Sequence, residues 1–222
     1  HIPRRHVTYG VSPQSDYCAR GIHFRGLETS FNAYRRGEPL GGFTVRMPGA
    51  HNVLNCLATI AIADELEVPL DVTKQALASF EGVARRFTIV GTVESVTVVD
   101  DYGHHPAEIR ATLDAARRAF PGDDRRVVVA FQPHRYTRTK DLFHDFTQCF
   151  NQADVLLVTD VYAAGEAPIP GATSDRLVQA IREHGHHDAR YVPDKLELPD
   201  VLEKLVRPGA LRDHDVAGAP AT

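Results

Sequence analysis

Short apolar runs alternate with helically spaced apolar residues in the second half of the chain. The apolar runs predict strands at about 97–99, 127–131, 155–159 and 190–192. The helical spacing predicts helices at about 106–120, 139–151 and 174–184, the last capped by Ser174 and ended by Gly185. Such alternation implies right-handed crossovers, so we expect an α/β fold with a mostly parallel sheet.

The first half has a different pattern. Residues up to about 47 form short alternating runs broken by glycine and proline, which predict antiparallel strands and hairpins. A helix with an apolar face follows from about Leu54, and a second is predicted at 71–79 with Asp71 as its cap. Gly82 and a basic pair then interrupt the periodicity. We therefore expect a domain boundary at this glycine.

Composition narrows the class of protein. The 222 residues are 43% apolar, which suffices for a packed core, and the net charge of -4 with interspersed signs predicts no nucleic-acid partner. No apolar run approaches the ~20 residues of a membrane span, and residues 1–10 lack a signal pattern. We expect a cytoplasmic protein without membrane insertion. The three cysteines lack CxxC spacing, which indicates reduced thiols rather than a disulfide framework or a zinc ribbon.

Unusual polar residues follow three of the predicted strands. These clusters are Asp100–His105, Gln132–Arg138 and Asp160–Glu166. Because the carboxyl ends of parallel strands share one edge of a sheet, we expect the three loops to converge on one crevice.

The crevice carries groups suited to an anion. Arg135 and Arg138 have guanidinium groups that bind a carboxylate or a phosphate with two hydrogen bonds. Tyr102 and His104 would add a hydrogen-bonding wall. Both an amino-acid carboxylate and a phosphate fit this description.

A metal site is an alternative for the same crevice. His104, His105 and His134 with Asp100 and Asp101 could ligate a divalent ion in a hydrolase, although their spacing matches no common metal motif. The chain contains neither a GxxxxGK[ST] loop nor a GxGxxG fingerprint. Any phosphate cradle for a nucleotide must therefore lie elsewhere.

Asn52 and Asn55 lie in the first turn of the first predicted helix. They are three residues apart and so project from one face, where free N–H groups favour anionic or carbonyl-bearing ligands. One asparagine could instead be an ordinary helix cap, but a helix needs only one cap residue.

Five stretches of the chain together resemble the Mur ligases of peptidoglycan synthesis. They are residues 48–55, 80–87, 100–106, 131–139 and 160–171. The resemblance spans about 8–207, and Phe131–Thr139 favours the members that add L-alanine. It implies that 83–209 form a Rossmann-like amino-acid-binding domain and that 1–82 are the C-terminal portion of the central ATP-binding domain.

The resemblance also implies an activity. In this family ATP phosphorylates the carboxylate of UDP-N-acetylmuramate to an acyl phosphate, the amine of L-alanine attacks it, and Mg²⁺ holds the phosphates. The family's N-terminal UDP-binding domain and its phosphate loop, with most magnesium ligands, have no counterpart in these residues. We therefore expect the chain alone not to turn over. The alternatives are the metal-dependent hydrolase and a non-catalytic amino-acid-binding module.

Residue roles follow from the same resemblance. The positions matching nucleotide contacts are Asn52, Asn55, Arg86 near the ATP phosphates and Asp101 at the ribose. The positions matching the L-alanine side are Tyr102, His104, Arg135 and Arg138. Of these, His104, Arg135 and Arg138 are expected to be catalytic. Asp100 is expected only to support the turn, and Glu166 has no assigned role.

The end of the chain departs from the family pattern. Residues 210–222 are polar and unpatterned, and we expect them to be disordered. The sheet would then lack its last strand and expose an edge.

Overall fold

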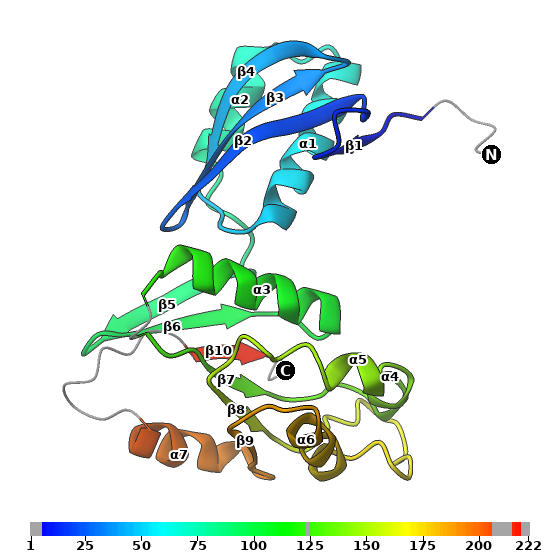
Figure 1. Cartoon of the computed structure of the whole chain (residues 1–222), viewed down its shortest axis with the longest axis vertical. Coiled ribbons are helices and arrows are strands. Elements are labelled where there is room, and N and C mark those ends of the chain that lie inside the picture. The colour runs from blue at the N-terminus through cyan, green and yellow to red at the C-terminus, as the bar shows by residue number, and fades with distance from the viewer. Residues whose placement is uncertain (1–5, 123–124, 206–214, 219–222) are drawn as a thin grey trace. The chain divides into compact units, whose positions relative to one another are not determined.

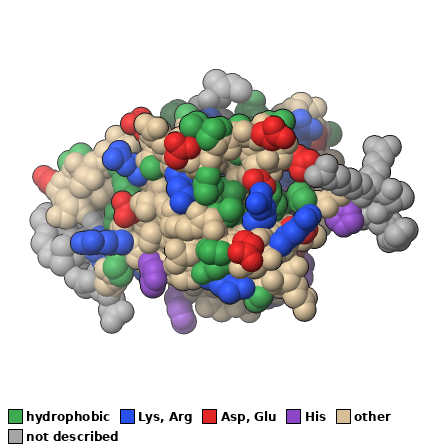
Figure 2. All heavy atoms as spheres, turned by 90° about the horizontal axis from the view of Figure 1, so that it is seen from above, with side chains coloured by type: hydrophobic (Ala, Val, Ile, Leu, Met, Phe, Trp, Pro, Cys, Tyr) green, Lys and Arg blue, Asp and Glu red, His purple; other side chains and the backbone are tan. Residues whose placement is uncertain are grey.

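The computed structural model describes residues 6–122 and 125–205 and the backbone of 215–218. The chain divides into two compact units, His1–Gly82 (unit 1) and Val83–Thr222 (unit 2) (Figure 1). On the face drawn in Figure 2, basic and acidic side chains are intermixed. Within the described residues, no helix has the length and apolar character that crossing a membrane requires.

Unit 1 is a four-stranded sheet packed against two helices. Its strands follow the order β1 (Tyr9–Gly10), β2 (Tyr17–Arg25), β3 (Glu28–Arg35) and β4 (Glu38–Val45). β2, β3 and β4 pair antiparallel, as predicted, while β1 pairs parallel with β2. The apolar face of α1 (Ala50–Glu65) packs on buried sheet residues such as Phe31, Phe43 and Val45.

The second helix of unit 1, α2, spans Leu70–Ser79 with Pro69 at its N-cap. The prediction that Asp71 caps this helix was wrong. Asp71 lies inside the first turn, where its negative charge is favourable beside the free N–H groups without forming a cap.

Unit 2 contains a six-stranded sheet in the order β5-β6-β10-β7-β8-β9. The strands are β5 (Thr88–Val93), β6 (Val96–Asp101), β7 (Val128–Phe131), β8 (Val155–Val158), β9 (Ala189–Tyr191) and β10 (Asp215–Gly218). Only the β5–β6 pair is antiparallel among these strands, so the mostly parallel sheet is confirmed. β5 was not predicted, because its hairpin turns through Glu94 and Ser95 at positive φ without an Asn-Gly or Asp-Gly signal.

Helices cover both faces of this sheet. They are α3 (Pro106–Ala119), α4 (Tyr136–Asp141), α5 (Phe143–Phe146), α6 (Ser174–Glu183), η1 (Lys195–Glu197) and α7 (Leu198–Leu205). Leu113 of α3 and Leu177 of α6 join one buried cluster with Val129 and Leu156 of the sheet. The alternate residues of the same strands pack against α7. β7 and β8 are therefore buried on both faces, as their unbroken apolar runs indicate.

Two predicted helices differ in detail. The helix expected at 139–151 is two short helices, because Leu142 between α4 and α5 leaves helical geometry at φ -109° and ψ 17°. α6 has Thr173 rather than Ser174 at its N-cap, and neither supplies a side-chain cap. Gly185 follows α6 at φ 98°, as predicted for a helix terminator.

The prediction of a disordered tail was wrong for Asp215–Gly218, which form β10. This strand lies inside the sheet and pairs parallel with β6 and β7, so neither of those strands is an exposed edge. Backbone hydrogen bonds on both sides hold it, and such pairing does not require a side-chain pattern. Residues 210–214 and 219–222 of the predicted tail lie outside the described residues.

Candidate active site

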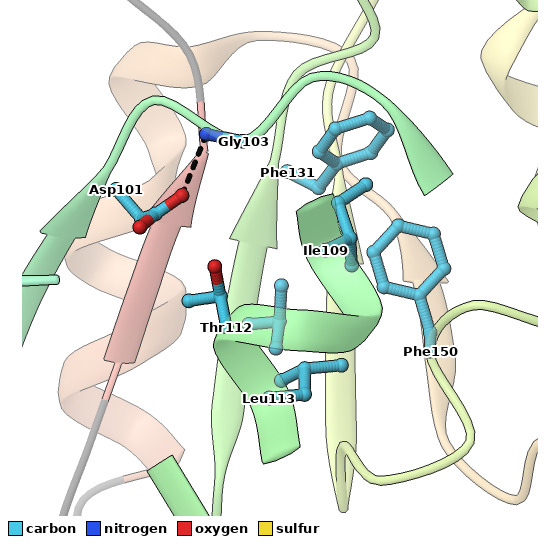
Figure 3. Close-up of a pocket in the computed structure, with 8 residues that line it drawn as sticks. Asp101, Gly103, Ile109, Thr112, Leu113, Phe131 and Phe150 are labelled. Carbon is cyan, nitrogen blue, oxygen red and sulfur yellow. Dashed lines mark hydrogen bonds between the residues drawn. The ribbon is translucent and has the colours of Figure 1, made fainter. Parts of the chain in front are cut away.

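Asp101 ends β6 and fastens the turn that follows. Its carboxylate accepts hydrogen bonds from the N–H of Phe87 at 2.9 Å and of Gly103 at 2.7 Å, and the residue is only 5% exposed. Figure 3 shows the bond to Gly103. A Cβ on Gly103 would lie 2.8 Å from Asp101 Oδ1, so only glycine fits here without a shift. Each oxygen of the carboxylate placed at the ribose by the family resemblance thus accepts one backbone N–H group, from Phe87 before β5 and from Gly103 in the turn.

A small hollow lies between α3 and the sheet below this turn (Figure 3). It is lined mainly by apolar side chains, among them Ile109, Leu113, Phe131 and Phe150. A lining of this kind contains no guanidinium or amide group that would bind an anion. The polar groups suited to substrate lie in the loops at the carboxyl ends of the strands.

Glu108, in the first turn of α3, joins Arg86 to the loop Asp100–His105, the first of the three loops. One carboxylate oxygen accepts the N–H groups of His104 at 3.1 Å and His105 at 3.2 Å, and the other accepts Arg86 Nη1 at 3.3 Å. Burial opposes ionisation of Glu108, but the His104 N–H, the His104 ring and the Arg86 charge outweigh it and lower its pKa. His105 caps the same helix through its own ring, in a reciprocal capping box with Glu108.

Aromatic and basic side chains gather around Tyr102. Its ring lies edge-on to that of His104 at 5.3 Å between centroids, and the guanidinium carbons of Arg85 and Arg86 lie 5.2 and 5.7 Å from its centroid. The Tyr102 N–H donates to the Arg85 carbonyl at 2.7 Å, and Arg85 pairs with Asp100 at 3.2 Å. Asp100 thus supports the turn through Arg85.

The second loop, Gln132–Arg138, is joined to the third loop, Asp160–Glu166, by backbone contacts. His134 and Tyr162 form a parallel bridge, and the Arg135 N–H donates to the Tyr162 carbonyl at 2.8 Å. The rings of His134 and Tyr162 are stacked with centroids 5.2 Å apart. Arg138 Nη1 lies 3.3 Å from both the carbonyl and Nδ1 of His134. Burial, followed by the charges of Arg138 and Arg135, lowers the pKa of His134 and favours a neutral ring.

Glu166 has a defined place in the third loop. Its carboxylate accepts the N–H of Thr137 at 2.9 Å and the Thr137 hydroxyl at 2.8 Å, at the N-terminus of α4. It also lies 3.7 Å from Arg135 Nη1. Arg135 adopts φ 72°, an unusual conformation for a bulky residue. Glu166 thus caps α4 from another loop and faces the strained arginine that precedes it.

The structure brings the three loops together. His104 of the first loop and His134 of the second have ring centroids 6.5 Å apart, and His134 in turn contacts Tyr162 of the third. Tyr162 and His134 lie in the clusters that were expected to converge, but no individual role was predicted for Tyr162 or Glu108, and His134 was named individually only as a possible metal ligand. The spacing of Glu108 after His104 and His105 is that of a capping box, a signal that was available for Glu108.

Asn52 and Asn55 belong to the first turn of α1 in unit 1. Gly49, at φ 99°, is the N-cap of this helix and has no side-chain cap, so neither asparagine is the cap. Asn52 donates its amide to the Pro48 carbonyl at 2.8 Å, and Asn55 donates to Asn52 Oδ1 at 3.3 Å. The two amides are thereby linked on one side of the first turn.

Metal ligands do not gather in the described part of the chain. No group of three or more His, Cys, Asp or Glu side chains there is arranged to hold an ion. Within the proposed hydrolase set, His105 caps α3 and Asp101 binds backbone N–H groups. The described residues therefore offer no ligand set for that alternative.

Comparison with known proteins identifies similar chains. Residues 85–213 match the family model described as Mur ligase, glutamate ligase domain. The chain is 82% identical over 208 residues to the UDP-N-acetylmuramate--L-alanine ligase of Sorangium cellulosum, and 60% identical over 208 residues to the ligase of the same name from Anaeromyxobacter. These alignments cover 94% of this chain but only 44% of each relative.

A solved structure shares the fold. The UDP-N-acetylmuramate-alanine ligase of Thermotoga maritima superposes with a TM-score of 0.76 at 30% identity, covering 97% of this chain and 45% of that one. The chain therefore spans less than half the length of the relatives that it matches.

Proposed function

The chain belongs to the Mur ligase family, and from this premise we propose that it is part of an ATP-dependent ligase that joins L-alanine to UDP-N-acetylmuramate. The observation that carries the proposal is the 82% identity, across 94% of this chain, to the alanine ligase of Sorangium cellulosum. Because the reaction consumes ATP, we place it in the cytoplasm.

In this proposal the crevice of unit 2 binds L-alanine. Arg135 and Arg138 receive its carboxylate through charge-assisted hydrogen bonds, while Tyr102 and the neutral ring of His134 form the wall beside it. The arginines fix the orientation of the amino acid, so its amine reaches the activated carboxyl carbon in a productive geometry.

His104 is the proposed acceptor of a proton from the amine. Its Nδ1 lies 3.1 Å from the Tyr102 carbonyl oxygen. A carbonyl oxygen can accept a hydrogen bond but cannot donate one, so Nδ1 carries the proton and Nε2 is the basic atom. The amine nitrogen bonds to the acyl carbon, the bond from that carbon to the phosphate oxygen breaks, inorganic phosphate leaves, and one amine proton passes to Nε2.

In unit 2 we propose that Arg86, whose side chain is 48% exposed, contacts a nucleotide. In unit 1 we propose such a contact for Asn52 and Asn55. Asp101, placed at the ribose by the resemblance, also holds the turn in unit 2, because its oxygens accept the N–H groups of Phe87 and Gly103. Mg²⁺ would neutralise the phosphate oxygens. Its ligands belong, in this proposal, to the part of such ligases that this chain does not span.

A chimeric enzyme tests the proposal. The 208 residues of the Sorangium cellulosum ligase that align with this chain are replaced by the residues of this chain. We expect the chimera to release phosphate from ATP only when UDP-N-acetylmuramate and L-alanine are both present. In the chimera, Arg138→Ala should raise the KM for L-alanine by about tenfold or more, because a lost charge-assisted hydrogen bond costs about 1.5–3 kcal/mol.

The controls separate binding from folding. Arg176→Ala alters an exposed arginine of α6 that bonds to Gln179, and it should leave the KM unchanged. A folded chimera that releases no phosphate with L-alanine, or that prefers another amino acid, would contradict the proposal.

A further inference from the structure

We propose that Glu108 is a positioning residue that fixes the nucleotide side and the amino-acid side of the site relative to one another. The inference rests on the proposed function, because it concerns how the residues of that site are held. Glu108 is not among the residues that the family resemblance identifies.

The first observation is that Glu108 uses its two oxygens for different partners. One oxygen holds the backbone N–H groups of His104 and His105, and the other holds the guanidinium of Arg86 at 3.3 Å. A capping box requires only the first of these functions. The contact with Arg86 is additional, and it joins two segments 22 residues apart in the sequence.

The second observation is that four side chains contact one another in a closed circuit, which consists of Glu108, Arg86, Tyr102 and His104. Arg86 lies 5.7 Å from the ring of Tyr102, Tyr102 contacts the ring of His104, and His104 Nδ1 lies 3.7 Å from the same carboxylate that binds Arg86. A shift of Glu108 would therefore displace the proposed phosphate-binding arginine and the proposed proton acceptor together.

An ion pair between Arg86 and Glu108 holds part of this circuit. Both the Arg86 and Glu108 side chains are partly exposed, at 48% and 33%, so their ion pair contributes little to stability. The consequence of the ion pair is geometric, because it holds a partly exposed guanidinium 5.7 Å from the centre of the Tyr102 ring. We accordingly expect loss of the Glu108 charge to affect catalysis more than folding.

Glu108→Gln separates the bonds to the His104 and His105 N–H groups from the ion pair with Arg86. Glutamine keeps an oxygen that accepts the His104 and His105 N–H groups, as capping boxes allow, but presents Arg86 with an uncharged amide. Asp114→Asn is the matched control, since it removes a comparable ion pair with Arg118 from the same helix α3. Thermal unfolding of both variants should remain close to that of the parent chain.

The positions of the side chains are measured in the 222-residue chain by NMR. In Glu108→Gln, the nuclear Overhauser contacts between Arg86 and the Tyr102 ring should be lost, whereas Asp114→Asn should retain them. Unchanged contacts in Glu108→Gln would overturn the proposal whether or not the chain belongs to an active ligase.

The consequence for catalysis is measured in the chimera. Glu108→Gln should lower kcat/KM for L-alanine about tenfold, and it should cause little further loss when Arg86→Gln is already present, because both substitutions break one contact. Activity equal to that of Asp114→Asn, or a loss matched by a fall in thermal stability, would overturn the positioning role. A parent chimera without L-alanine-dependent activity would instead contradict the proposed function and leave the NMR result to decide on Glu108.

Discussion

The contact between Asp101 and Gly103 determines the shape of the turn that carries Tyr102 and His104. The glycine N–H lies 2.7 Å from the carboxylate, and an added Cβ would stand 2.8 Å from the same oxygen. The conformation of this turn therefore depends on glycine at position 103. A residue without a side chain lets the buried carboxylate of Asp101 approach the backbone N–H.

Gly103→Ala should destabilise unit 2 by about 1–3 kcal/mol, since the added methyl group must displace the carboxylate or the turn. Chemical denaturation followed by circular dichroism measures the change. Gly91→Ala is the control, because a Cβ at Gly91 meets nothing within 4 Å. Equal stability of the two variants would show that the turn accommodates a side chain.

Protonation of Glu166 should loosen α4 at low pH. The Thr137 N–H and then its hydroxyl, with the charge of Arg135 assisting, lower the pKa of Glu166 below its ordinary value of 4.5. A lowered pKa in the folded state means that the stabilisation is present above 4.5 and is lost as the pH falls through the folded-state pKa. The Thr137 amide shift, followed by NMR, should titrate with a midpoint below 4.5. In Glu166→Gln this titration should disappear, and its persistence would assign it to another group.

Candidate residues were easier to choose from the sequence than the contacts that they make. Arg135, Arg138, Tyr102 and His104 were candidates because few other side chains suit a carboxylate or a proton at a strand end, and their roles stay predictions. The contact of Glu166 with Thr137 was not predictable, because Thr137 lies 29 residues away and is reached only when two loops meet. The burial of Asp101 and its bond to Phe87, 14 residues earlier, became visible only in the fold, and its assignment to the ribose stays a prediction.

At the scale of elements, apolar runs located β7 and β8 most directly, because strands buried on both faces are apolar throughout. β6 and β9 were also predicted, although each contains polar residues. Short helices and pairings between distant segments were harder to predict. The break at Leu142 carries no glycine or proline, and β10 is held by two neighbouring strands rather than by its own side-chain pattern.

Val216→Pro tests the central position of β10. Proline lacks the N–H that a strand paired on both sides requires, so we expect a loss of about 3 kcal/mol or more. Hydrogen exchange should show reduced protection in β6 and β7. Val216→Thr retains the N–H and a β-branched side chain and serves as the control. Unchanged protection in the proline variant would contradict the pairing of β10 with these strands.

At the scale of the whole molecule, each unit has a hydrophobic core of its own. Unit 1 has one buried cluster, which includes Phe31 and Leu57, and unit 2 has two, one on each face of its sheet. A unit with its own core can fold by itself. Residues 83–222, expressed alone, should therefore give a dispersed amide NMR spectrum that overlays the corresponding signals of the full chain. A collapsed spectrum of the isolated unit, with the full chain well dispersed, would show that unit 2 requires the first 82 residues.

The central place of β10 also bears on how this protein is made. A ribosome completes β10 after all the other described strands of unit 2, and yet β10 separates β6 from β7 in the finished sheet. Until it arrives, both strands have an unpaired side that can bind a strand of another molecule. Unit 2 is thus open to aggregation through these strands until its synthesis is nearly complete. A chaperone that shields unpaired strand edges should raise the yield of folded chain.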